Sequence, residues 1–168
     1  MKEYKFPYWG PPLLKFEVDN KFVNLLLEKG NESREKNLDH RATLAGQIEN
    51  EYYYENYKDW FFSGIKDYVD AFCMVAKERQ DDAFELPPKG WLLTSLWINY
   101  QQANEYNPPH NHKGHVSFVI YLKVPEEIKK ENEQRKEDHN NPGPGTINFN
   151  FGPELPFCLR LFHHLPEV

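Results

Sequence analysis

The residues best suited to chemistry in this chain are two histidines, His110 and His112, which are separated by one residue. On an extended backbone, side chains alternate between two faces with a period of two, so we expect both imidazoles to point the same way. Imidazole is a ligand for iron, zinc, copper and nickel, and two imidazoles leave positions for a third protein ligand and for substrate. The spacing therefore predicts that the pair holds one metal ion.

The residues ahead of the pair favour a preformed site. Pro108 and Pro109 restrict the backbone there, which lowers the entropy lost when a ligand geometry is imposed. The alternative is a polar loop whose histidines face water. The histidine pattern alone does not decide between a metal site and this alternative.

The sequence leaves the third metal ligand open. His115 is out of phase with the pair unless Gly114 introduces a bulge. His163 and His164 are adjacent near the end of the printed chain, so one of them could reach a site while the other faced away. The candidates for a third ligand are therefore His115, His163 and His164, and the alternative is that the chain supplies no third ligand.

Other catalytic signatures are missing from the sequence. A cupin would carry a glutamate about four residues after its H-x-H motif, but Val116 stands there. The chain has no H-E-x-x-H helix, paired C-x-x-C, glycine-rich phosphate loop or G-x-S-x-G turn. These absences weaken cupin, hydrolase and nucleotide-binding interpretations.

Composition restricts the compartment and the partners. The 168 residues carry a net charge of -6, with basic residues scattered among acids, so we expect no direct nucleic-acid partner. No apolar run is long enough to span a membrane, and the start of the chain lacks a secretion signal, so we expect a cytoplasmic protein. Cys73 and Cys158 are then expected to be reduced thiols without chemistry.

The first half of the chain has helical periodicity. Asp19 or Asn20 is expected to cap the first helix and Gly30 to end it. The third helix is predicted from a wide apolar stripe with spacings of three and four. The predicted helices cover residues 18–29, 38–53 and 57–79.

The second half changes to extended runs. Strands are predicted over 91–100, 116–124, 146–151 and 157–162. Residues 125–144 are too polar to pack and are predicted to form a long mobile loop, the natural lid over a substrate. We therefore expect one α+β domain over residues 1–168, in which a helical layer (1–86) buttresses a β-rich half (91–168).

Five segments carry a resemblance through their order and spacing, and they are Trp97–Tyr100, Glu105–His112, Ser117–Leu122, Gly145–Phe149 and Leu165–Val168. Taken together, they resemble a family of largely uncharacterised 2-oxoglutarate and Fe(II)-dependent oxygenases found in phages and marine bacteria. The segment 44–48 also looks like the helical preface of that family. The resemblance spans most of the chain.

The resemblance implies a double-stranded β-helix, or jelly roll, with iron at its open end. The usual ligands in this superfamily are a histidine, a carboxylate two residues later and a distant histidine. Here His110 and His112 match the motif, so a second imidazole takes the carboxylate position. The family pattern continues beyond Leu165–Val168, where the printed chain stops. The roll is therefore expected to be incomplete at its C-terminus, with open sheet edges that could pair with a second copy.

The resemblance also implies the cofactors Fe(II) and 2-oxoglutarate. Asn99, Tyr121 and Asn148 are expected to project toward the metal and bind the oxo-acid or the substrate. The expected function is a dioxygenase that hydroxylates a small molecule or a peptidyl side chain, although the sequence does not identify the substrate or show whether the printed chain is active. The alternatives are a non-catalytic jelly-roll binding module and a particle-assembly protein.

Overall fold

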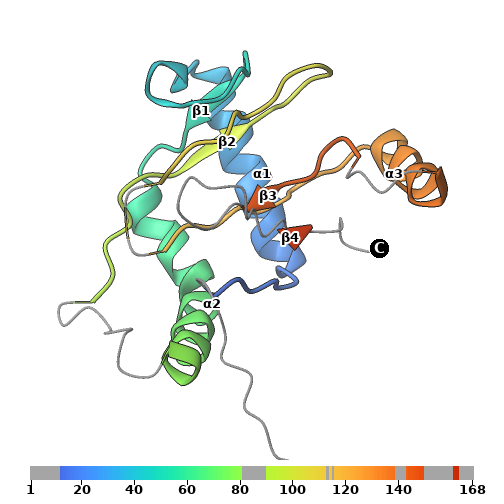
Figure 1. Ribbon diagram of the computed structural model, residues 1–168. Helices are drawn as coiled ribbons and strands as arrows, with labels where there is room; N and C mark the ends of the chain where they lie inside the picture. The colour runs from blue at the N-terminus through green and yellow to red at the C-terminus, as the bar shows by residue number, and fades with distance from the viewer. Residues whose placement is uncertain are drawn as a thin grey trace, which may run out of the picture. The chain divides into compact units, whose positions relative to one another are not determined.

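The computed structural model describes residues 12–80, 90–112, 114, 116–138, 143–149 and 161–162. Leu14–Ile120 form one compact unit, and the described residues outside that range belong to a second. The first unit contains α1 (Asn20–Glu35), η1 (Arg41–Thr43), β1 (Glu51–Tyr53), α2 (Tyr57–Gln80) and β2 (Trp97–Asn99). The second contains α3 (Glu126–Asp138), β3 (Asn148–Phe149) and β4 (Leu161–Phe162) (Figure 1). The α+β class is confirmed.

The first predicted helix is confirmed as α1, but it is longer than the sequence indicated. Asp19 is the N-cap, and its carboxylate accepts a hydrogen bond of 2.7 Å from the Lys21 amide. The expected stop, Gly30, lies inside the helix. A Cβ there would be 2.5 Å from Ile98 Cδ1 in β2. The glycine therefore lets α1 lie close against the sheet (Figure 1).

The third predicted helix is confirmed as α2, and one of its faces forms the centre of the core. The Phe22 ring of α1 packs 5.5 Å from the Phe61 ring, centroid to centroid. A Cβ at Gly64 would be 2.3 Å from the Phe22 ring, so Gly64 leaves the space that this ring fills. The buried side chains of α2 recur at helical spacing and are Phe61, Ile65, Cys73 and Ala76.

The second predicted helix, over 38–53, is wrong. The segment contains the short η1 and then β1, which pairs antiparallel with β2 in the register Glu51↔Asn99, Tyr52↔Ile98 and Tyr53↔Trp97. Consecutive tyrosines favour a strand, and pairing with β2 overrides the weak helical spacing. Because side chains alternate, Tyr52 and Ile98 share the face toward α1. The opposite face carries Glu51, Tyr53, Trp97 and Asn99.

The predicted strands are shorter than expected. Only 97–99 of the first run is a strand, and the described residues of 116–124 form none. The last two runs contain β3 and β4, which pair antiparallel in the register Asn148↔Phe162 and Phe149↔Leu161. The described residues thus contain two separate two-stranded sheets, which do not establish a jelly roll.

The predicted mobile loop over 125–144 is wrong for most of its length, because residues 126–138 form the helix α3. Glu126 and Glu127 lie in its first turn, where negative charge interacts favourably with the helix dipole. Arg135 and Glu131 form an i,i+4 ion pair of 2.9 Å. A segment of glutamate, lysine and arginine is polar enough to resemble a loop, yet each of these residues is a good helix former.

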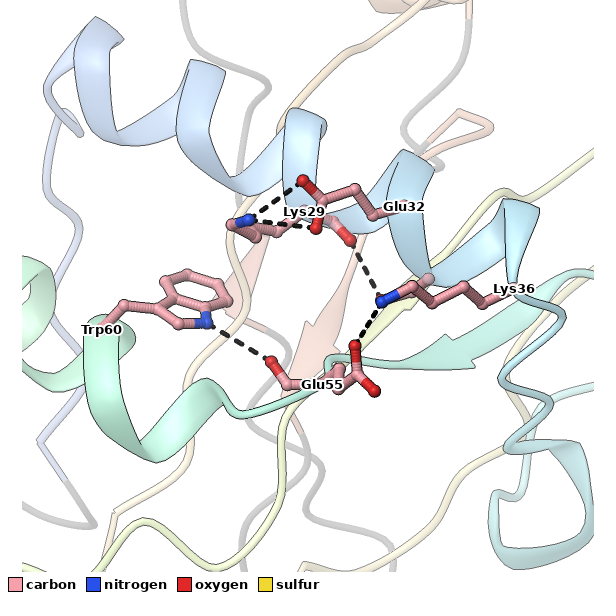
Figure 2. Close-up of polar contacts among 6 residues, drawn as sticks. Lys29, Glu32, Lys36, Glu55 and Trp60 are labelled. Carbon is pink, nitrogen blue, oxygen red and sulfur yellow. Dashed lines mark hydrogen bonds and ion pairs between the residues drawn. The ribbon is translucent and has the colours of Figure 1, made fainter.

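A set of polar contacts connects the end of α1 with the start of α2 (Figure 2). The Lys36 ammonium, just after α1, bonds the Glu55 carboxylate. Trp60 Nε1 in α2 donates to the Glu55 carbonyl at 3.4 Å. Within α1, Lys29 and Glu32 form an ion pair of 2.9 Å. These groups are half exposed and contribute little energy, so their effect is to fix the local arrangement of the two helices.

The described helices include none with the length and apolar character needed to cross a membrane. Cys73 is a free thiol in the core, and burial raises its pKa. Such a thiol is a poor nucleophile, as the sequence predicts for this residue. Cys158 lies outside the described residues.

Candidate metal centre

The structure brings the imidazoles of His110 and His112 together. Their Nε2 atoms are 3.0 Å apart, and their ring planes meet at 67°. Two nitrogen ligands about 2.1 Å from one metal, at right angles, lie about 3 Å apart. The separation therefore fits neighbouring positions on one metal ion. Both side chains are exposed, so a metal and a substrate have access from solvent.

The backbone sets the orientation of His110. Its Nδ1 is 2.7 Å from the Pro108 carbonyl oxygen. A carbonyl can only accept, so Nδ1 carries the proton, and in the neutral ring Nε2 has a free lone pair directed at His112. Metal-binding histidines commonly donate their other ring N–H to a carbonyl in this way. The Pro108 carbonyl thus orients the ring so that Nε2 faces His112.

A tryptophan from the sheet supports the second histidine. Trp97 in β2 stacks on His112, with ring centroids 6.0 Å apart and an angle of 21° between the planes. Burial lowers the pKa of His112, and His110 lowers it further, so the neutral ring is favoured. The Trp97 ring also lies 6.2 Å from the His40 ring, which in turn lies 6.0 Å from the Tyr53 ring, centroid to centroid.

The third ligand is not found among the residues that the structure describes. No group of three His, Cys, Asp or Glu side chains in those residues is placed to hold a metal ion. The three histidines that the sequence offers for this role, His115, His163 and His164, lie outside the described residues. The described site therefore consists of two nitrogen ligands.

The three predicted cofactor-binding residues are split between the two units. Asn99 is in β2, on the sheet face that carries Trp97. Tyr121 and Asn148 belong to the other unit, where Tyr121 is exposed and Asn148 pairs with Phe162. The joint role of the three residues at the histidine pair therefore stays a prediction.

A buried acidic residue that the sequence analysis missed lies directly opposite Asn99. Glu51 is 1% exposed, and neither of its carboxylate oxygens has a hydrogen-bond partner among the described residues. The Asn99 Oδ1 atom is also buried without a partner in that part of the chain. Burial raises the pKa of the Glu51 carboxyl, and the negative charge of Glu105 raises it further. The binding of 2-oxoglutarate by Asn99 stays a prediction.

No family model, curated protein or solved structure matches this chain.

Proposed function

We propose that this protein is an Fe(II)-dependent oxygenase-type protein whose iron is bound by His110 and His112. The observation that supports it is the pair of Nε2 atoms 3.0 Å apart, with the Pro108 carbonyl holding the proton on the far nitrogen of His110. The same two histidines match the ligand motif of the oxygenase family that the sequence resembles. Because of that resemblance, the proposal also includes a jelly-roll fold and 2-oxoglutarate as the co-substrate.

Iron in such a site would supply oxygen activation for hydroxylation of a substrate. The residues of this chain would bind the ion, keep the two imidazoles neutral and orient them. Trp97 would shield one side of His112 from water. The exposed side of the pair would then remain for co-substrate and substrate, whose class the site does not select.

The second imidazole is the feature that distinguishes this pair from the usual ligand set. His112 is neutral where a carboxylate would be negative, so the bound metal would keep more positive charge. A carboxylate at this position should therefore raise the affinity for Fe(II). His112→Asp tests this point, because it recreates the usual histidine and carboxylate spacing.

The experiment is an anaerobic titration of the protein with Fe(II), in which calorimetry measures the heat of binding with and without 2-oxoglutarate. The wild-type chain should bind one equivalent, more tightly when 2-oxoglutarate is present, and His110→Ala should abolish binding. Asn111→Ala is the matched control, because Asn111 is an exposed residue between the two histidines. Binding that survives His110→Ala, or no binding by the wild-type chain, would overturn the proposal.

The proposal extends to compartment and self-association. Ferrous iron and the reduced thiol of Cys73 both suit the cytoplasm. Within the described part of the chain, β2 has β1 as its one strand neighbour, so its other edge is available for pairing with a second copy. Light scattering over a concentration series tests this association.

A further inference from the structure

We propose a second, separate metal site, in which Glu51, Asn99 and Asn107 bind a hard divalent cation of the Ca²⁺ class. These three residues are called the oxygen cluster below. Glu51 in β1 faces Asn99 in β2 across the register of the sheet. Asn107 lies in the segment that leads to the histidine pair. Nothing in the proposed role of the histidines requires this cluster, so the two sites stand on different observations.

The first argument is the lack of any donor for the Glu51 carboxylate. Both of its oxygens, and Asn99 Oδ1 on the paired strand, are buried and find no hydrogen-bond partner in the part of the chain that the structure describes. Three adjacent buried acceptors without a donor are costly, because each has lost its hydrogen bonds to water. A cation in contact with them would neutralise the carboxylate and satisfy all three oxygens together.

The second argument is the charge of the surroundings. The charged groups that act on Glu51 are Glu105, Arg41 and Asp39. Arg41 is already committed to Asp39, through Nε at 2.9 Å and Nη2 at 2.7 Å from its carboxylate oxygens. Glu105 accepts hydrogen bonds from two backbone amides, which hold its side chain in place. The field at Glu51 is therefore negative and attracts a cation.

The third argument is the convergence of oxygen atoms on Gly46. A Cβ at this glycine would lie 2.6 Å from Glu51 Oε1 and 2.8 Å from Asn107 Oδ1. Carboxylate and amide oxygens are the ligands that Ca²⁺ takes in proteins. Asn107 is exposed, so a small ion can reach the buried Glu51 from the side of Asn107.

A cation here would brace the segment that presents the histidines. The Gln47 amide donates to the Tyr106 carbonyl at 2.8 Å, and the Glu49 amide donates to Glu105 Oε1 at 2.9 Å. These bonds already pair the segment before β1 with the segment before the histidine pair. An ion shared by Glu51 and Asn107 would add a cross-link at the same place.

The test is a Ca²⁺ titration of the chelator-treated 168-residue chain, read by calorimetry and by the shift in Tm. With one carboxylate in the cluster, we expect a Kd of about 10⁻⁴ to 10⁻³ M, typical of weak sites. Glu51→Gln should remove both the heat and the Tm shift. Glu49→Gln, the same change at an exposed neighbour, should leave both intact.

Asn99→Asp provides a test in the opposite direction. A second carboxylate should tighten Ca²⁺ binding by about tenfold or more, because site charge tunes affinity. The proposal is overturned if Ca²⁺, Mg²⁺ and Mn²⁺ leave the Tm of the wild-type protein unchanged and Asn99→Asp gains no affinity. His110→Ala must keep the Ca²⁺ response, so failure of the histidine site and failure of the oxygen cluster are told apart.

Discussion

The histidine pair and Asn107 of the oxygen cluster lie on one short segment, 107–112, yet the two groups are built in different ways. The histidines are exposed, and their rings contact one carbonyl and one stacked tryptophan. Glu51, the acidic member of the cluster, is buried, and its oxygens have no donor among the described residues. Nitrogen donors suit iron and its neighbours, whereas oxygen donors suit harder ions. If both proposals hold, one loop serves two metals of different character.

The largest effect expected is that variants of one site leave metal binding at the other site unchanged. His112→Ala should lower the affinity for Co²⁺, a probe of the histidine pair, by on the order of 100-fold or more, because a direct ligand is lost. Glu51→Gln should leave Co²⁺ binding unchanged. The measurement is the Co²⁺ absorption spectrum during titration. Loss of Co²⁺ binding in Glu51→Gln would show that the two sites are one.

A substitution at Gly46 tests how tightly the oxygen cluster is packed. Gly46→Ala should destabilise the fold by about 1 kcal/mol, because the added methyl group displaces the ends of the Glu51 and Asn107 side chains, of which Glu51 is buried. A Cβ there would be 2.6 Å from Glu51 Oε1. Urea unfolding measures the loss, with Ala45→Ser at the exposed neighbour as the control. Equal stability of Gly46→Ala and wild type would contradict the convergence of these oxygens.

The support of His112 by the sheet is expected to have a smaller effect. Trp97→Leu should weaken Co²⁺ binding about tenfold, as expected for a residue that orients a ligand without touching the metal. Tyr53→Leu is the control, because Tyr53 shares the sheet face with Trp97 but has its own ring contact with His40. Weakening to the same degree by both variants would point to general damage of the sheet.

The smallest effect concerns the ion pair that keeps Arg41 away from Glu51. The pKa of Asp39 is lowered from 3.8 to about 2, first by hydrogen bonds from Arg41. Because the folded pKa is the lower one, this stabilisation is present above 3.8 and is lost as the pH falls through about 2. Arg41→Gln should return the pKa toward its ordinary value in a carboxyl NMR titration. The pair is exposed, so stability should change little.

The sequence predicted those elements whose periodicity is strong. The apolar stripe of α2 and the Asp19 cap of α1 are local signals, and both are confirmed. The prediction of a helix over 38–53 was wrong because β1 pairs with β2, which lies more than forty residues later, and no local pattern reveals this partner. The prediction of a loop over 126–138 was wrong because a charged helix and a solvated loop have the same polarity.

The candidate site residues also differ in whether the sequence reveals them. His110 and His112 are recognisable from their type and spacing, and the structure places their Nε2 atoms together. Glu51 gave no signal, because a glutamate in a polar stretch is normally solvated. Its burial depends on its place opposite Asn99 and beside Gly46, which only the fold creates.

The most direct test of the account is X-ray absorption spectroscopy of the protein loaded with one equivalent of Fe(II) under anaerobic conditions. The account predicts two imidazole ligands at about 2.1 Å in the wild-type chain and one in His112→Ala. A spectrum with oxygen ligands alone, unchanged by His112→Ala, would contradict the assignment of His110 and His112 as a metal-binding pair.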